Sequence, residues 1–326
     1  MKFLSKLSAL VVLGAAMAMP ALAQEKVTIY SAAPQDLLDR VIPAFEKASN
    51  MKVELIKGGS GDLINRLKAE ARRSTADVLF AVSTDVVEAN TKLFTQFTPD
   101  NAKHLASAFK INDAAIPFTA IATSFGINRN QLTPAQYPKT WIDLGNPIYK
   151  GKISAARPDK SGSAYIQLAQ ILQIYGEEKG WEIYSKILDN TVLSNSSGAV
   201  SKLVNDGEAS IGLSNEDTML KYKVGGGPVE LLYPADGTTV LADVMALTAT
   251  PINARGGKLF IEFMLSKEAQ EILDAVGRRP VRGDVVTKSP LTPLNKLKVV
   301  NYNDDWAGAN RARILAKWNE LLLNKK

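Results

Sequence analysis

The chain has 326 residues, of which 46% are hydrophobic, and a formal net charge of +6 at pH 7, with a single histidine and no cysteine. The lack of cysteine excludes disulfides, thiolate metal sites and cysteine nucleophiles. One histidine leaves almost nothing from which to build a Ser-His-Asp triad or a histidine-rich metal site. Basic residues never form a run longer than a pair, so nucleic acid is not an expected partner. We predict no catalytic residue, cofactor or metal site.

The beginning of the chain has the pattern of an export signal. Lys2 and Lys6 precede an apolar stretch from Leu7 to Met19. The segment Pro20-Ala21-Leu22-Ala23 follows it, with small residues at the spacing of a signal-peptidase cleavage site. The alternative is an N-terminal membrane anchor, but the stretch is shorter than the roughly 20 residues that a spanning helix needs. We therefore predict a cleavable signal peptide over residues 1–23 and a mature protein that works outside the cytoplasm, with no cysteine at the cleavage site for lipid attachment.

The first part of the mature chain alternates predicted strands and helices. The β-branched run Val27–Tyr30 predicts a strand, and apolar residues follow at helical spacing from Leu37 to Ala48. Val53–Ile56 and Asp77–Val82 are further strands, and a helix follows the loop Gly58–Asp62. This alternation predicts an α/β fold with a mainly parallel sheet covered by helices on both faces.

The second part continues in the same way. Strands are predicted near residues 191–193, 210–213 and 244–247, and helices over 165–175, 178–188, 199–206 and, for the most part, 253–273. The last helix is amphipathic, and its large apolar residues are interpreted as core anchors: Trp306, Ile314, Trp318 and Leu321. A mature chain of roughly 300 residues is long enough to form two hydrophobic cores, yet no linker sequence marks a boundary between two domains. Two lobes would have to be joined by ordered segments.

The candidate ligand-binding residues lie in loops that follow a strand and begin a helix, because ligands bind at the carboxyl ends of strands in open parallel sheets. These loops contribute Ser31, Ala32, Gly59, Ser60, Gly61, Ser83, Thr84, Ser161, Gly162, Ser163, Ser196, Ser197 and Gly198. Free backbone N–H groups, the positive end of the helix dipole and hydroxyls suit a phosphate, phosphonate, sulfate or carboxylate. For any one loop taken alone, the alternative is a helix cap without a ligand.

Charged residues give a second set of candidates. Glu216 and Asp217 follow a predicted strand. One interpretation is that they accept hydrogen bonds from ligand hydroxyls or from an ammonium group. The alternative is that they form the acidic first turn of a helix. Arg157 is a candidate counter-charge or a surface arginine. The single histidine, His104, lies in a polar segment and is expected at the surface.

Several segments carry a family resemblance: residues 27–31, 141–144, 149–153, 206–212, 229–234 and 260–270, with the motifs Trp-x-Asp-Leu, Tyr-Lys-Gly-Lys-Ile and Phe-Ile-x-Phe-x-Leu-Ser-x-Glu-x-Gln. They resemble the periplasmic substrate-binding proteins of ABC importers, in the branch with ferric-iron, phosphonate and hexose-phosphate binders. The resemblance implies the two-lobed type II fold, each lobe a mainly parallel sheet flanked by helices, which closes on a ligand in the cleft between the lobes. Lobe 1 is expected to comprise residues 24–120 and 243–326, and lobe 2 residues 121–242, with crossovers near 120–122 and 236–242.

The resemblance also bears on the ligand. Iron-binding members have a tyrosine pair where this chain has Glu216-Asp217, and often a histidine where it has Ser31-Ala32, so phenolate ligation at those positions is excluded. Residues 195–200 and 215–217 are more similar to the hexose-phosphate binders, although Ser201 replaces their usual histidine.

The resemblance implies a periplasmic protein and a monomer. We predict that it is not an enzyme and that it captures a small phosphorylated or phosphonate organic anion, such as a sugar phosphate or an aminoalkyl phosphonate. Its expected partners are this anionic solute and the permease of an ABC importer. The alternative cargo is ferric iron with a synergistic anion. An exported hydrolase, a different class, would need a nucleophile–base pair that the sequence does not offer.

Overall fold

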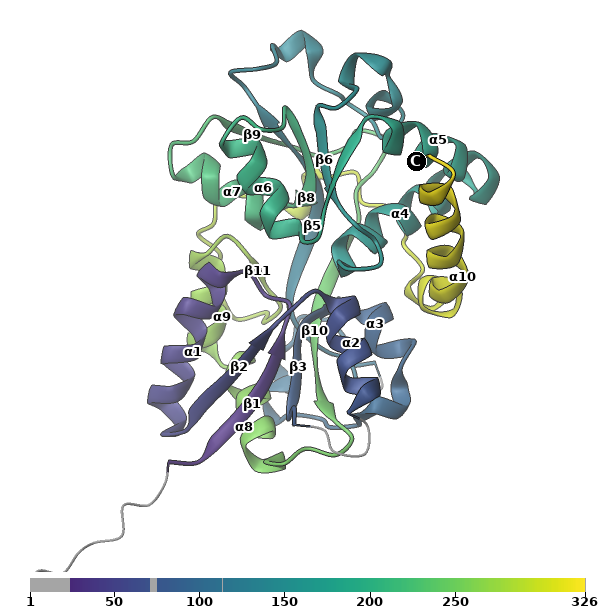
Figure 1. Ribbon diagram of the computed structural model, residues 1–326. Coiled ribbons are helices and arrows are strands. Elements are labelled where there is room, and N and C mark those ends of the chain that lie inside the picture. Colours follow the sequence, from purple (N-terminus) through teal and green to yellow (C-terminus); the bar gives the residue numbers. More distant parts are fainter. Residues whose placement is uncertain (1–23, 71–74, 113, 326) are drawn as a thin grey trace, which may run out of the picture.

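The computed structural model describes residues 24–70, 75–112 and 114–325. The predicted signal peptide, residues 1–23, lies outside the described residues. Figure 1 shows two α/β lobes, one above the other, with β5 (Ile116–Asn128) and β10 (Val240–Thr248) running between them. The two-lobed α/β architecture predicted from the sequence is confirmed.

Lobe 1, the lower lobe in Figure 1, is built on β1 (Lys26–Ser31), with β2 (Lys52–Lys57) and β3 (Val78–Ser83) parallel to it on either side. β10 lies antiparallel between β3 and the first half of β5, and the short strands β4 (Phe94–Thr95) and β11 (Arg279–Pro280) complete the sheet. Side chains alternate along the strands. Val27 and Ile29 therefore pack against α1 (Gln35–Ser49), α8 (Ala254–Met264) and α9 (Lys267–Ala275), and Tyr30 against α2 (Ser60–Ala69).

Lobe 2 repeats the arrangement. β6 (Ile153–Ala156) pairs in parallel with β7 (Thr191–Ser194) and β8 (Ile211–Asn215), and the second half of β5 lies antiparallel between β8 and β9 (Val229–Leu232). α4 (Gly162–Tyr175) and α5 (Glu177–Asp189) contribute to the larger core of this lobe, and α6 (Ser197–Asn205) and α7 (Glu216–Val224) to the smaller one. Both sheets are thus parallel over three strands and antiparallel at the crossover strands.

Shorter helices complete the chain: α3 (Thr84–Glu88), η1 (Thr91–Leu93), η2 (Asp100–His104), η3 (Pro134–Gln136), η4 (Asp143–Gly145), η5 (Pro147–Tyr149) and η6 (Leu294–Lys296). The helix predicted over 253–273 is two helices, α8 and α9. The chain breaks at Ser266, whose hydroxyl accepts a hydrogen bond from the Ala269 N–H at 3.2 Å and so caps α9.

The crossover strand β5 serves both sheets. Its residues up to Ala122 pair with β10 in lobe 1, and from Thr123 onward they pair with β8 in lobe 2. Thr123 also contacts the returning chain, because its hydroxyl lies 2.7 Å from that of Thr239 and its carbonyl accepts from the Thr238 hydroxyl at 2.6 Å. The two lobes are therefore joined through paired backbone and not through free linkers.

Residues 243–326 were predicted to belong to lobe 1, but the last helix, α10 (Asp304–Leu323), packs against the core of lobe 2. Ala307, Ile314 and Trp318 belong to the larger core of lobe 2, and the Ala307 carbonyl accepts from the Tyr165 hydroxyl at 2.5 Å. Trp318 is fully buried, as expected of a core anchor. An ion pair from Arg311 to Asp85 attaches the same helix to α3 of lobe 1.

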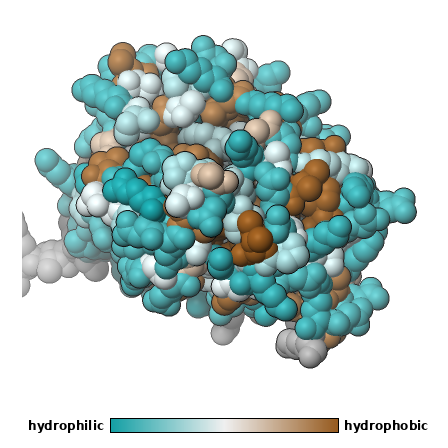
Figure 2. All heavy atoms as spheres, turned by 90° about the horizontal axis from the view of Figure 1, so that it is seen from above, coloured by the Kyte–Doolittle hydropathy of each residue, from teal (hydrophilic) through white to brown (hydrophobic). Residues whose placement is uncertain are grey.

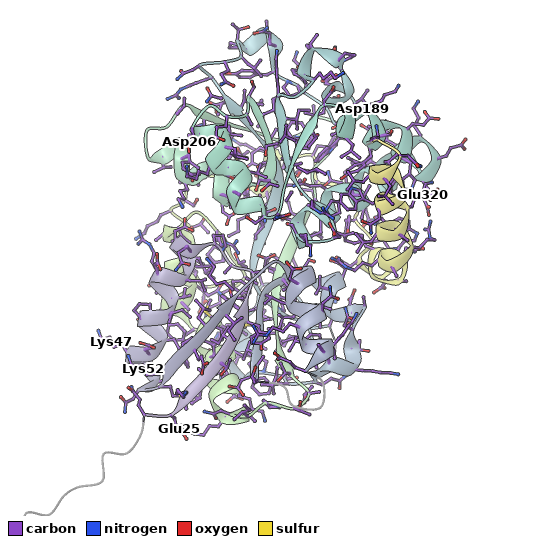
Figure 3. All side chains as sticks on the ribbon, in the orientation of Figure 1. Glu25, Lys47, Lys52, Asp189, Asp206 and Glu320 are labelled. Carbon is purple, nitrogen blue, oxygen red and sulfur yellow. The ribbon has the colours of Figure 1, made fainter. Side chains whose placement is uncertain are left out.

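The upper face of the molecule is largely polar. Seen from above, Figure 2 shows mostly hydrophilic residues with separate hydrophobic patches between them. The charged residues labelled in Figure 3, among them Lys47, Asp189 and Asp206, lie at the periphery of the lobes. In the part of the chain that the structure describes, no helix is both long and apolar enough to cross a membrane.

Candidate functional site

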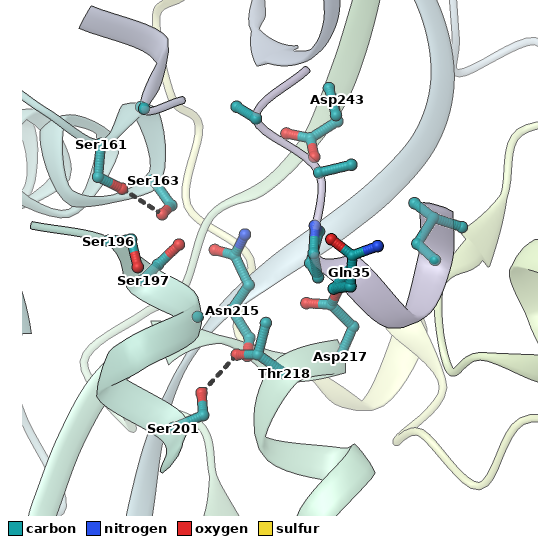
Figure 4. A pocket seen from close by; sticks show the side chains of 18 of the residues that line it. Gln35, Ser161, Ser163, Ser196, Ser197, Ser201, Asn215, Asp217, Thr218 and Asp243 are labelled. Atoms are coloured by element: carbon teal, nitrogen blue, oxygen red, sulfur yellow. Dashed lines mark hydrogen bonds between the residues drawn. The ribbon is translucent and has the colours of Figure 1, made fainter. Parts of the chain in front are cut away.

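A cavity of about 480 Å³ lies between the two lobes. Lobe 1 lines it with the loops that follow β1 and β2 and with the end of β3, and lobe 2 with the loops that follow β6 and β7 and with the junction of β8 and α7. Figure 4 shows the side chains that face this space. The carboxyl ends of the parallel strands of both sheets therefore meet at one cavity, which is where open α/β sheets bind their ligands.

Several helices begin at this cavity, and their N-cap residues are Pro34 of α1, Gly59 of α2, Ser161 of α4, Ser196 of α6 and Asn215 of α7. The caps of α4 and α6 accept hydrogen bonds from the N–H groups of Ala164 and Ala199, at 3.4 and 3.3 Å. Within the described chain, the caps of α1, α2 and α7 make no such side-chain bond. The first turns of α1 and α2 therefore have N–H groups without a side-chain cap, and together with the helix dipoles these favour an anion. The first turn of α7 carries Glu216 and Asp217 and does not favour an anion.

Most of the residues predicted to bind a ligand line the cavity: Ala32, Gly59, Ser60, Ser83, Ser161, Gly162, Ser163, Ser196, Ser197, Gly198 and Asp217. Ser31, Gly61, Thr84 and Glu216 are outside this lining. The Ser31 hydroxyl accepts from the Ala33 N–H at 3.0 Å and shapes the loop from within. Gly61 instead lies against lobe 2, where a side chain would overlap the carbonyl of Asp159.

Glu216 is turned away from the cavity and is 1% exposed. Its Oε1 accepts from the Arg279 Nε at 2.7 Å and from the Ala122 N–H at 3.0 Å. Its Oε2 accepts from the Arg279 Nη2 at 2.9 Å and from the Tyr233 hydroxyl at 2.6 Å. Burial, together with the Glu216 charge, raises the pKa of Tyr233, which therefore stays a donor. The side chain predicted to accept from a ligand is thus occupied in fixing the crossover strand to α7.

Asp217, the neighbouring acid, does line the cavity, and its Oδ2 accepts from the Arg278 Nε at 2.7 Å. The same guanidinium donates through Nη1 to the Asp243 Oδ2 at 3.0 Å. Arg278 is 3% exposed, and it comes from the segment after α9 in lobe 1, whereas Asp217 comes from lobe 2. This buried ion-pair network therefore crosses between the lobes at the cavity wall.

Lysines form a second link between the lobes. The Lys160 Nζ lies 2.5 Å from the Asp62 Oδ1, and the Lys221 Nζ lies 3.3 Å from the Asp36 Oδ2. Both lysines belong to lobe 2 and line the cavity, whereas both acids belong to lobe 1. These partly exposed pairs hold the two sides of the cavity together.

Sequence reasoning missed several residues that line the cavity: Lys57, Lys160, Ser201, Lys221, Asp243 and Arg278. A charged residue inside the otherwise apolar run 240–247 was the available signal for Asp243. Arg157, the proposed counter-charge, lies outside the lining, because it pairs with Asp159 at 2.9 Å and stacks over the Trp318 ring. Across residues 24–70, 75–112 and 114–325, no cluster of three or more histidine or acidic side chains is arranged to hold a metal ion.

The fold and the cleft define a two-lobed periplasmic binding protein of type II. The chain belongs to the family of bacterial extracellular solute-binding proteins, which it matches over residues 74–304. Proteins of this family serve ABC importers: they bind small solutes and interact with the permease, and they are not enzymes.

Individual relatives span nearly the whole chain. An uncharacterized protein of Haemophilus influenzae is 29% identical over 97% of this chain and 96% of its own length. A periplasmic protein of Salmonella typhimurium, named provisionally for 2-aminoethylphosphonate binding, is 26% identical over 98% of both chains. A periplasmic binding protein of Actinobacillus pleuropneumoniae, solved with fructose-6-phosphate bound, superimposes with a TM-score of 0.86 at 25% identity, covering 91% of this chain and 98% of that one.

Proposed function

We propose that this protein captures a small organic anion with a phosphate or phosphonate group in the interlobe cavity and presents it to the permease of an ABC importer. The observation that carries the proposal is the convergence of helix N-termini from both lobes on one cavity that is rich in hydroxyls. A tetrahedral phosphorus oxyanion has several acceptor oxygens and can satisfy donors from more than one helix at once. Removal of residues 1–23 on export to the periplasm is part of the proposal.

The names of two relatives support this ligand class. 2-Aminoethylphosphonate and fructose-6-phosphate differ in their organic part but share a phosphorus oxyanion. The cavity also has Lys57 at its edge, where the Nζ donates to the Gln35 Oε1 at 2.6 Å and adds positive charge near the start of α1. The anionic end of the ligand is therefore assigned to the helix starts other than that of α7, whose first turn is acidic.

Thermal denaturation of the purified protein with a panel of solutes tests the proposal. The panel contains 2-aminoethylphosphonate, fructose-6-phosphate, glucose-6-phosphate and inorganic phosphate, with fructose, ethanolamine and ferric citrate for comparison. A solute at 100 times its Kd should stabilise the protein by about 2.7 kcal/mol. Stabilisation by at least one organic phosphate or phosphonate, and not by its phosphorus-free counterpart, is the expected result. Stabilisation by ferric citrate alone would contradict the proposal.

A variant sharpens the test. Ser163→Asp places a negative charge at the start of α4, in the cavity lining, and should abolish anion binding by repulsion. Ser266→Asp is the matched control, because Ser266 caps α9 away from the cavity and aspartate is an equally good N-cap. The control should bind as tightly as the wild type.

A further inference from the structure

One wall of the cavity carries more negative charge than the structure balances. Asp217 of α7 and Asp243 of β10 both line the cavity, and both accept from the one guanidinium of Arg278, at 2.7 and 3.0 Å. Two carboxylates beside one guanidinium leave a net negative charge in a poorly solvated place. A buried charge without a counter-charge is costly, so this wall favours a positively charged ligand group.

Asp217 has an unused acceptor at this wall. Its side chain is 6% exposed, and Oδ2 is engaged by Arg278. Oδ1 is buried and has no hydrogen-bond partner among the described residues. Buried carboxylate oxygens normally have partners, so an oxygen left without one in a cavity wall marks a place for a donor from outside the chain.

Asp243 shows the same imbalance. Burial raises the pKa of its carboxyl, the charge of Arg278 opposes the rise, and the charge of Asp217 adds to it. Three lysines line the cavity with other partners: Lys160 and Lys221 pair with Asp62 and Asp36, and the Lys57 Nζ donates to the Gln35 Oε1. Among the described residues, none of the three forms an ion pair with Asp217 or Asp243. An ammonium group placed between the two carboxylates would relieve their repulsion.

The two ends of the cavity differ in chemistry. In Figure 4 the hydroxyls of Ser161, Ser163, Ser196 and Ser197 gather on one side, and Asp217 and Asp243 lie on the other. The serine side belongs to the starts of α4 and α6, which favour an anion. The acidic side favours a cation. A ligand that satisfies both sides carries opposite charges at its two ends.

We propose that Asp217 and Asp243, held in place by Arg278, form a subsite for a primary ammonium group, so that the ligand is a zwitterion with a phosphorus oxyanion at its other end. This inference rests on the function proposed above and narrows it to aminoalkyl phosphonates and phosphate esters of amino alcohols. A sugar phosphate can donate hydroxyls to Asp217, but it leaves the extra negative charge unbalanced. Arg278 is a positioning residue, since it orients the two carboxylates that contact the ammonium group.

Isothermal titration calorimetry with 2-aminoethylphosphonate and ethylphosphonate tests the subsite, because these ligands differ in the amino group. The wild type should bind the amino compound more tightly by about tenfold or more, the value of a hydrogen-bonded charged group. Asp217→Asn and Asp243→Asn should each bring this ratio close to one and leave the affinity for ethylphosphonate nearly unchanged. Phosphoethanolamine should behave as 2-aminoethylphosphonate does.

Asp36→Asn is the control, because Asp36 also lines the cavity but is paired with Lys221 at its edge. It should keep the wild-type ratio. Equal affinity of the wild type for both phosphonates would overturn the ammonium subsite and leave the proposed function standing, and so would a ratio that both asparagine variants preserve. Failure of every phosphonate and phosphate ester to bind would overturn the proposed function and the subsite together. If one asparagine variant does not fold, the ratio of affinities for the two phosphonates in the wild type and in the other variant still tests the ammonium subsite.

Discussion

Replacing Gly59 with alanine should weaken ligand binding by forcing the two lobes apart. Gly59 caps α2 in lobe 1 and faces the backbone of lobe 2. An alanine Cβ there would lie 3.1 Å from the carbonyl carbon of Lys160 and overlap its oxygen, well inside the 3.0 Å that real Cβ atoms keep. The obstacle is backbone and cannot rotate away, so the loop of lobe 2 must retreat by about 1 Å.

The size of the effect follows from this overlap. Forcing an extra methyl group into a packed contact costs about 1–3 kcal/mol. The cost falls on the state in which the lobes touch, since the contact joins lobe 1 to lobe 2 and neither core contains Gly59. Each 1.4 kcal/mol is a factor of about ten in affinity, so the Kd for ligand should rise roughly 5-fold to 150-fold. Stability without ligand should change little.

Calorimetry with 2-aminoethylphosphonate measures the affinity, and small-angle X-ray scattering of the same samples measures the radius of gyration. The variant should show a larger radius than the wild type at equal ligand concentration. Gly283→Ala is the control, because a Cβ at Gly283 meets only Ala106 at an ordinary 3.7 Å. Unchanged affinity and radius in Gly59→Ala would refute the reasoning, since they would show that the ligand binds without this contact between the lobes.

Four other substitutions probe charged residues. Lys160→Ala and Lys221→Ala each remove a partly exposed ion pair worth about 0–1 kcal/mol. Calorimetry should therefore show at most about a fivefold loss of ligand affinity. A larger loss would mean that the lysine contacts the ligand directly. Arg279→Gln leaves the Glu216 carboxylate buried without its cation, so urea denaturation should show that the free energy of unfolding falls by about 3–5 kcal/mol. A decrease below about 1 kcal/mol would contradict this role of Arg279. Burial and neighbouring acids raise the pKa of Asp304 to about 7, so the Asp304 carboxylate destabilises the fold increasingly as pH rises from about 4 to 7. Asp304→Asn should therefore raise Tm at pH 8 and not at pH 4. Equal Tm shifts at both pH values would refute this role of Asp304.

The location of the cavity could be predicted from the sequence, because it depends on local patterns. Gly59, Ser161 and Ser196 follow strands and begin helices, and the carboxyl ends of parallel strands meet at one edge of a sheet. No long-range contact had to be known. The helix starts that converge on the cavity follow from the alternation of strands and helices alone.

The roles of Glu216 and Asp217 could not be separated in the same way. Neighbouring residues on a helix point about 100° apart, so only one of the two can face a given cavity. Which one does so depends on Arg278 and Arg279, which are adjacent to each other but about sixty positions further along the chain. A pair of adjacent arginines facing a pair of adjacent acids is visible only once the two lobes are assembled.

The extent of β5 was also hidden. Residues 120–122 were predicted only as a crossover, whereas the strand runs from Ile116 to Asn128 and is buried throughout. Its apolar run is interrupted by Thr119, Thr123 and Ser124, whose hydroxyls bond backbone or side chains of other segments. Burial of these polar residues depends on partners in both lobes, so no local pattern predicts it.

The shared strand β5 also constrains the order in which the protein can assemble. The sheet of lobe 2 uses only strands between Thr123 and Leu232, so it can form before the rest of the chain is available. The sheet of lobe 1 begins earlier in the chain, yet β3 reaches β5 only through β10, which ends at Thr248. β1, β2 and β3 can pair with one another, but their connection to β5 requires β10, about 160 residues further along the chain, and this is a slow, non-local step. The sheet of lobe 1 contains the first strands of the chain, yet it is completed only after all the strands of lobe 2 are available.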